Sequence, residues 1–313
     1  METTRIALVF PGQGSQAIGM LKSLSAQYPI IKETFGVASD VIGYDLWQIA
    51  QDGPETRLNQ TTITQPALLA ADVACYRAWI QAGGQEPSWV AGHSLGEYAA
   101  LVGANALDFS DAVRLVADRA RFMQEAVPEG VGAMAAILGL DDADVEKLCM
   151  EHAQGEVLAA VNYNAPGQVV IAGIRTAVDR LVAAAKGAGA KRAILLPVSV
   201  PSHCALMVGA AKRLEERIEA TSIHMPLIPV IHNVNVGIAR TTSEVRMALV
   251  QQLYSPVRWV ETIQYLSTAG AHCLVECGPG KVLSGLNKRI ANIRCFALGE
   301  PADMALALAP TSV

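Results

Sequence analysis

A serine, Ser94, stands between Gly92 and Gly96 in the segment GHSLG, directly after the short apolar run 89–91. This spacing is typical of a nucleophile elbow, in which a strand turns sharply into a helix and exposes the serine hydroxyl. Glycines suit the flanking positions because a residue without a Cβ lets the neighbouring backbone pack closely. The exposed hydroxyl would attack an acyl carbon and form a covalent intermediate. An ordinary Gly-Ser turn is the alternative interpretation.

A serine hydroxyl needs a base to take its proton, and we predict that His203 is that base. His203 follows residues 198–202, where a predicted strand ends and the chain turns, so its ring can project into a cleft. The alternative is a core histidine packed beside Cys204 and Leu206. His93 precedes the serine directly, and we expect it to position the site rather than to act as the base.

The third member of a catalytic triad has no clear candidate in this sequence. In the usual hydrolase order an acid lies between the serine and the histidine, where Asp108, Asp111 and Asp118 are the nearest acids. Nothing in their context distinguishes one from another. A backbone carbonyl could orient the imidazole instead, so both possibilities stay open.

Arg119 interrupts the apolar face of a predicted helix. The apolar residues of that face are Ala112, Leu115, Val116, Phe122 and Met123. A guanidinium that faces a core is costly unless an anion meets it, and its planar fork matches a carboxylate. We therefore predict a receptor for a substrate carboxylate near the serine. A structural ion pair with an internal Asp or Glu is the alternative.

An oxyanion hole needs two donors aimed at the developing negative charge. The backbone N–H of Leu95, which follows the nucleophile, is the natural first donor. The loop 10–16 (FPGQGSQ) is the candidate source of the second. This loop lacks the lysine and the glycine spacing of a nucleotide-binding P-loop, which argues against ATP.

The order of predicted elements indicates an α/β fold with an insertion. Segments of strand and helix character alternate up to residue 125 and again after about residue 205, and Ser110 is the expected N-cap of the helix that carries Arg119. Between them the predicted order is β-α-β-β-α-β, the order of a ferredoxin-like fold. Its elements are strand 133–138, helix 141–153, strand 157–162, strand 168–173, helix 176–187 and strand 192–198.

We therefore expect two domains. A large α/β-hydrolase-like domain with a parallel sheet would comprise residues 1–126 and 199–313. A small ferredoxin-like α+β subdomain would comprise residues 127–198. Ligands commonly bind in the cleft between two such domains.

Composition narrows the class of protein further. The chain has 313 residues, 51% of them hydrophobic, and a net charge of −5, with no basic stretch interleaved with aromatics, so we expect no nucleic-acid partner. The apolar run 6–10 is too short for a signal peptide, which predicts a cytoplasmic protein. The uncharged segment 193–211 approaches membrane-spanning length, but Pro197 and Pro201 exclude a spanning helix, so we expect no membrane contact. The six cysteines form no CxxC pair, and we expect them to be reduced.

Taken together, these motifs resemble the malonyl-CoA:acyl carrier protein transacylases of bacterial fatty acid synthesis, and the resemblance runs nearly from end to end. The segments that carry it are FPGQGSQ at 10–16, GHSLGE at 92–97, Arg119, VPSH at 200–203, QLY at 252–254 and GPGK at 278–281.

The resemblance implies Ser94 as nucleophile, His203 as base and Arg119 as the partner of the malonyl carboxylate. It also implies that the backbone N–H groups of Gln13 and Leu95 form the oxyanion hole. The main-chain carbonyl of Gln252 would orient His203, and we group Gln252 and His93 with the substrate-binding residues. Malonyl-CoA and an acyl carrier protein would be the partners, and we expect no cofactor and no metal.

Two other functional classes remain as alternatives to this interpretation. A serine thioesterase or esterase would share the elbow but would have less need of Arg119, and a non-catalytic scaffold would not need Ser94 at all. For an acidic carrier protein, we expect a local basic patch near the cleft. Its candidate residues are Lys186, Lys191, Arg192, Lys281, Lys288 and Arg289.

Overall fold

The computed structural model describes residues 4–198 and 200–309 and contains two sheets. The first is a five-stranded sheet of order β7-β2-β1-β8-β9, in which every neighbouring pair is parallel. Its strands are β1 (Ile6–Phe10), β2 (Trp89–Gly92), β7 (Val230–Ile231), β8 (Cys273–Glu276) and β9 (Arg294–Ala297). The predicted strands at 6–10 and 89–91 are confirmed.

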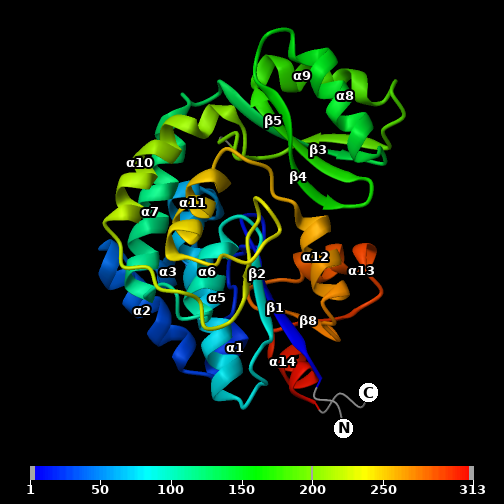
Figure 1. The fold of residues 1–313 in the computed structure, drawn as a ribbon. Helices are drawn as coiled ribbons and strands as arrows, with labels where there is room; N and C mark the ends of the chain where they lie inside the picture. Colours follow the sequence, from blue (N-terminus) through cyan, green and yellow to red (C-terminus); the bar gives the residue numbers. More distant parts are fainter. Residues whose placement is uncertain (1–3, 199, 310–313) are drawn as a thin grey trace.

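Helices cover both faces of this parallel sheet, which explains why β1 is apolar at every position. Leu8 and Phe10 point into one core, and Ala7 and Val9 point into the other. In Figure 1, α2, α5, α6 and α7 lie on one side of the sheet, and α12 and α13 lie on the other. A sheet that is buried on both faces holds the ends of its strands in a rigid frame.

The helices of the first core form the thicker layer. They are α1 (Lys22–Gln27), α2 (Ile30–Ile42), α3 (Leu46–Asp52), α4 (Glu55–Leu58), α5 (Thr61–Gln81), α6 (Gly96–Gly103), α7 (Phe109–Ala126), α10 (Val208–Glu219), α11 (Thr242–Gln252) and α14 (Pro301–Leu308). A short 3-10 turn, η1 (Ala205–Met207), precedes α10. The opposite layer consists of α12 (Trp259–Thr268) and α13 (Val282–Ile290).

The second sheet is antiparallel and has the order β4-β5-β3-β6. Its strands are β3 (Gly132–Leu138), β4 (Leu158–Ala165), β5 (Gln168–Ile174) and β6 (Arg192–Leu195). The helices α8 (Asp142–Ala153) and α9 (Arg175–Ala185) pack on one face of it, and the elements follow one another as β-α-β-β-α-β, as predicted.

The face of the antiparallel sheet opposite α8 and α9 packs against the part of the chain that contains the parallel sheet. Met134, Val161 and Val170 on this face form a cluster with Cys204. Backbone hydrogen bonds also join the two units, because Val257 N–H donates to the Val161 carbonyl at 2.8 Å. The small sheet, at the top of Figure 1, therefore covers the region where the chain around residue 203 passes.

Two local predictions need correction. Asp108, not Ser110, caps α7, because its side chain accepts from the backbone N–H groups of Ser110 and Asp111. Strand β6 ends at Leu195 rather than at residue 198; the backbone bond from Leu196 N–H to the Met134 carbonyl follows it, directly before Pro197.

Cysteine pairing, membrane-spanning helices and metal-binding clusters complete the description of the fold. All six cysteines are free thiols, as expected. None of the helices in the described ranges combines the length and apolar character that crossing a bilayer requires. Over those same ranges, no group of three or more His, Cys, Asp or Glu side chains is arranged to hold a metal ion.

Candidate active site

Ser94 lies at the turn between β2 and α6, and its backbone is in the left-handed region with φ of 51°. This region is strained for a residue with a side chain and must be enforced by its surroundings. A Cβ on Gly92 would lie 1.9 Å from the carbonyl carbon of Gly96, and one on Gly96 would lie 2.1 Å from the carbonyl oxygen of Phe10. Both glycines are therefore required for the close packing of this turn, and its geometry is that of the predicted elbow.

The Ser94 hydroxyl and the His203 ring are in hydrogen-bond contact, with 2.7 Å between Oγ and Nε2. On the other side of the ring, Nδ1 lies 2.7 Å from the main-chain carbonyl oxygen of Gln252. A carbonyl can only accept, so Nδ1 carries the proton and Nε2 is free to accept from the serine. His203 is buried, and burial together with the nearby Arg119 charge lowers its pKa to about 3.

None of the three candidate acids contacts this histidine. Asp108 caps α7, Asp111 pairs with Arg114, and Asp118 pairs with Arg121 and Arg217 on the exposed side of the helix. The carbonyl of Gln252 takes the place that an acid has in a triad, which decides between the two possibilities that the sequence left open.

Arg119 is buried on α7, with 1% of its surface exposed, and its guanidinium points at the serine. Its Nη1 donates to Gln65 Oε1 at 2.6 Å, and its Nη2 donates to Gln252 Oε1 at 3.1 Å and to Ser94 Oγ at 3.2 Å. No carboxylate in the described ranges lies within ion-pair distance of it. The alternative of a structural ion pair is therefore wrong.

Arg119 brings a positive charge to the cavity that contains Ser94. Burial lowers the pKa of Arg119, while Tyr98 and the Glu97 charge act in the opposite direction. The guanidinium carbon also lies over the Tyr98 ring, 5.7 Å from its centroid. Neutral oxygens alone accept from the guanidinium, so its charge is solvated without being cancelled. A guanidinium held in this way is suited to an incoming anion.

The cavity beside Ser94 is lined from both sheet units. Gln13, His93, Leu95 and Arg119 line it from the large unit, and Leu196 is among the residues that line it from the other side. The loop that carries Gln13 passes against the elbow, because a Cβ on Gly12 would lie 2.5 Å from the His93 carbonyl oxygen. The two predicted oxyanion donors thus border the same cavity as the serine.

His93 does not contact the serine hydroxyl. Its Nε2 lies 2.8 Å from Asn164 Oδ1 on β4, and its ring lies 5.4 Å from the Trp259 ring. Burial lowers the pKa of His93. It therefore links the elbow to the small sheet at the edge of the cavity, which agrees with a positioning role.

Comparison with known proteins agrees with the resemblance seen in the sequence. The chain is 56% identical over 306 residues to the malonyl CoA-acyl carrier protein transacylase of Escherichia coli K12, covering 97% of this chain and 99% of that protein. The chain belongs to this transacylase family. The Bacillus subtilis transacylase is 42% identical and covers 97% of this chain and 96% of its own length. A family model described as an acyl transferase domain matches residues 7–289.

Solved transacylase structures share the fold over nearly the whole chain. The Coxiella burnetii malonyl CoA-acyl carrier protein transacylase has a TM-score of 0.96 at 51% identity, and 97% of each chain is covered. A malonyl-transacylase solved in complex with its holo type II PKS acyl-carrier protein has a TM-score of 0.96 at 53% identity, with 97% of this chain and 99% of that one covered.

Four polar residues of this transacylase site were missed in the sequence. They are Gln65, Glu97, Asn164 and Asn233, and each makes a hydrogen bond to Arg119, Gln252, His93 or Ser94. Two of them had a signal, since Gln65 and Glu97 interrupt apolar helical stretches and are buried in α5 and α6. Asn164 and Asn233 each lie two residues from another asparagine, so neither stands out in the sequence.

Proposed function

We propose that this chain transfers the malonyl group from malonyl-CoA to the phosphopantetheine thiol of acyl carrier protein, through a malonyl ester on Ser94. The observation that carries the proposal is the Ser94–His203 pair beside an arginine that pairs with no carboxylate among residues 4–198 and 200–309. Malonyl-CoA presents a thioester carbonyl with a free carboxylate one methylene away, so both ends fit this arrangement. The names of the relatives support the same substrates.

The first half-reaction forms the acyl-enzyme. His203 Nε2 takes the proton from Ser94 Oγ while Oγ attacks the thioester carbon, and the Gln252 carbonyl stabilises the imidazolium through Nδ1–H. The backbone N–H groups of Leu95 and Gln13 stabilise the tetrahedral oxyanion. Collapse of this intermediate expels the CoA thiolate, which receives the proton from His203.

The second half-reaction is the reverse sequence with a different thiol. His203 takes the proton of the carrier protein's pantetheine thiol, and the sulfur attacks the malonyl ester on Ser94. The ester oxygen then leaves and recovers its proton from His203. No cofactor takes part, since CoA and phosphopantetheine belong to the donor and the acceptor.

Arg119 has a second effect in this mechanism. Its charge is the second cause, after burial, of the low pKa of His203. A malonyl carboxylate on Arg119 offsets this charge and makes the imidazole a stronger base when substrate is bound. The receptor thus favours the malonyl donor through binding and through the base.

We infer that residues 127–198 form a ferredoxin-like subdomain inserted into an α/β-hydrolase-like domain of residues 1–126 and 199–313. The strand order of the antiparallel sheet and its own apolar core support this division. Residues 1–3, 199 and 310–313 of these ranges lie outside the described residues. The cytoplasmic location also stays a prediction.

The carrier protein's basic docking patch stays a prediction as well. Lys281 pairs with Asp303, and Arg289 donates to Gln168 and to the Pro166 carbonyl, so these two cations already have partners. Lys186, Lys191, Arg192 and Lys288 remain exposed candidates, and the first two form the pair for a test. A double charge reversal at Lys186 and Lys191 should raise the KM for carrier protein, and an unchanged KM would exclude them.

Intact-mass analysis after incubation with malonyl-CoA tests the proposal. The wild type should gain one malonyl group that Ser94→Ala lacks, and addition of holo acyl carrier protein should discharge it onto the carrier. Release of CoA with free malonate and no transfer would identify a thioesterase. No adduct and no turnover would identify a scaffold.

A further inference from the structure

Glu97 is a buried carboxylate without any exposed surface, three residues after the nucleophile in the first turn of α6. Its Oε2 accepts from Gln252 Nε2 at 2.8 Å and from the backbone N–H of Asn233 at 3.1 Å. Its Oε1 lies 2.7 Å from His232 Nδ1. The mechanism above gives this carboxylate no role, although a buried charge is costly to maintain.

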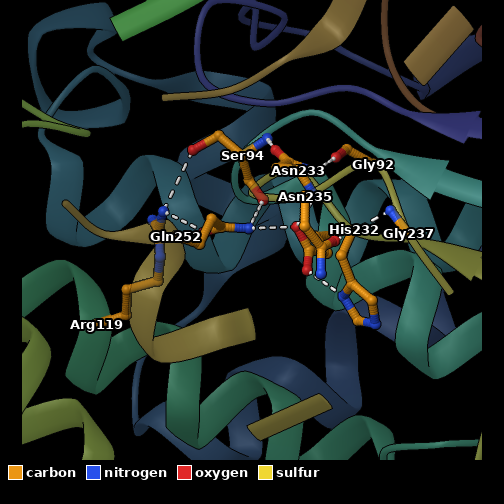
Figure 2. Close-up of polar contacts among 9 residues, drawn as sticks. Gly92, Ser94, Arg119, His232, Asn233, Asn235, Gly237 and Gln252 are labelled. Atoms are coloured by element: carbon orange, nitrogen blue, oxygen red, sulfur yellow. Dashed lines mark hydrogen bonds and ion pairs between the residues drawn. The ribbon is translucent and has the colours of Figure 1, made fainter. Parts of the chain in front are cut away.

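The partners of Glu97 hold the nucleophile's backbone from both sides. Asn233 Oδ1 accepts from the Ser94 N–H at 2.7 Å, and Gln252 Nε2 donates to the Ser94 carbonyl at 2.9 Å. Asn233 Nδ2 also donates to the Gly92 carbonyl at 2.6 Å, just before the turn. Figure 2 shows both links converging on the elbow. The Ser94 backbone is in the strained left-handed region, and these hydrogen bonds hold it in that conformation.

Gln252 connects the same carboxylate to the rest of the site. While its Nε2 binds Glu97, its Oε1 accepts from Arg119, and its main-chain carbonyl accepts from His203. The neutral Gln252 amide therefore lies between the guanidinium and Glu97 and is hydrogen-bonded to both. This arrangement orients Arg119 and leaves it without a local counter-ion.

His232 completes the support of Glu97. The ring is buried, and the described residues offer no polar partner to its Nε2. Nδ1 therefore carries the single proton and donates to Glu97, because a proton on Nε2 would be a buried donor without an acceptor. Three donors, from His232, Asn233 and Gln252, thus converge on one carboxylate.

We propose that Glu97 is a positioning residue, which sets the geometry of Ser94, His203 and Arg119 together through Asn233 and Gln252. It touches no reacting atom and acts on the Ser94 backbone, the Gln252 carbonyl and the Gln252 amide. The identity of the acyl group rests on the proposed function, whereas the effect on Ser94 reactivity does not. Small displacements of catalytic groups, of about 1 Å, cost up to roughly a hundredfold in rate.

Glu97→Gln is the first test because it keeps the size of the side chain. If the new NH2 group takes the place of Oε2, it faces the Gln252 and Asn233 donors. If it takes the place of Oε1, it faces His232 Nδ1–H, unless His232 moves its proton to Nε2, which has no polar partner among the described residues. We expect the rate of Ser94 acylation per folded molecule to fall by about tenfold to a hundredfold. Two reagents report it: malonyl-CoA by intact mass, and a fluorophosphonate, which reacts with an activated serine and needs no malonyl receptor.

Glu276→Gln is the matched control. Glu276 is equally buried, on β8, and accepts from the backbone N–H groups of Leu283 and Ser284, but it has no bond to the Ser94 network. Its replacement should lower the Tm and leave both acylation rates unchanged. The proposal is overturned if Glu97→Gln reacts at the wild-type rate with both reagents, or if both variants slow equally.

Gln252→Met keeps the test decisive if Glu97→Gln does not fold. It retains the main-chain carbonyl under His203 and removes only the amide that links Glu97 to Ser94 and Arg119. We expect slower fluorophosphonate labelling and a lower malonyl-to-acetyl rate ratio, and wild-type values for both would overturn the proposal. A wild type labelled at Ser94 by fluorophosphonate but not by malonyl-CoA would refute the proposed function alone.

Discussion

Arg119 Nη2 lies 3.2 Å from Ser94 Oγ, so the cation that we assign to the substrate carboxylate is within hydrogen-bond distance of the nucleophile. A malonyl group has one methylene between its carboxylate and its thioester carbon. A receptor next to the attacking oxygen is therefore where its carboxylate would lie when the carbon is in reach. An uncharged acetyl group in the same site would offer Arg119 no carboxylate and would leave it with neutral partners such as Gln65 and Gln252.

Arg119→Ala should separate malonyl from acetyl transfer. Loss of two charge-assisted hydrogen bonds to the carboxylate, each worth about 1.5 to 3 kcal/mol, should slow acylation by malonyl-CoA by about 100-fold or more. Acylation by acetyl-CoA should change less than about tenfold. Burst kinetics of CoA release with each donor measure the ratio. Arg114→Ala, on the exposed side of the same helix, is the control, and equal losses for both donors in a folded protein would contradict the receptor role.

The pH dependence of acylation should lack an acid limb near the ordinary histidine pKa of 6.5. Burial and Arg119 lower the pKa of His203 to about 3, so the base stays unprotonated, and the activity is retained, down to far lower pH than usual. In Arg119→Ala the second of these causes is gone, and the limb measured with acetyl-CoA should move to higher pH. Rates from pH 4 upwards, with circular dichroism to confirm folding, test this, and a limb near 6.5 in the wild type would contradict it.

Gly96→Ala should destabilise the fold and displace the loop before Gln13. The added Cβ would lie 2.1 Å from the Phe10 carbonyl oxygen, and backbone on both sides prevents an easy adjustment. We expect a loss of about 3 kcal/mol or more in the free energy of unfolding, measured in urea. Gly209→Ala, in open space on α10, should instead gain about 0.5 to 1 kcal/mol. Equal behaviour of the two variants would contradict the close-packing argument.

Asp72→Asn should make the protein more stable at neutral pH. Asp72 is fully buried in α5, without a hydrogen-bond partner among the described residues, and burial, with Glu276 second, raises its pKa well above 3.8. The folded state then binds a proton that the unfolded chain releases, so stability falls as pH rises above 3.8 towards the folded pKa, by up to about 1.4 kcal/mol per pH unit.

The Tm of Asp72→Asn relative to wild type should accordingly increase from pH 5 to pH 8. Asp40→Asn, on the exposed side of α2, is the matched control and should follow the wild-type curve. A gap between Asp72→Asn and wild type that stays constant or narrows with rising pH would show that the buried carboxyl does not retain its proton.

The parts of the site with local signals could be predicted from the residues alone. The GHSLG segment predicted the elbow because a strand, a strained turn and two glycines have to be neighbours in the chain. Arg119 was found because one charge interrupted a helical apolar face, and the β-α-β-β-α-β order followed from the change of hydrophobic period. His203 was chosen over five other histidines by its place at a strand end, and the structure brings it to Ser94.

The polar partners of these groups come from distant parts of the chain and are brought together by folding. Gln65 meets Arg119 across 54 residues of sequence, Glu97 meets Asn233 across 136, and Gln252 carries its carbonyl to His203 across 49. From the residues alone, the last contact left no local signal, since every residue has a main-chain carbonyl, and the family resemblance was what pointed to it. Hydrogen bonds at such separations depend on how helices pack on the sheet, because packing sets which distant polar atoms come within 3 Å, and local sequence does not.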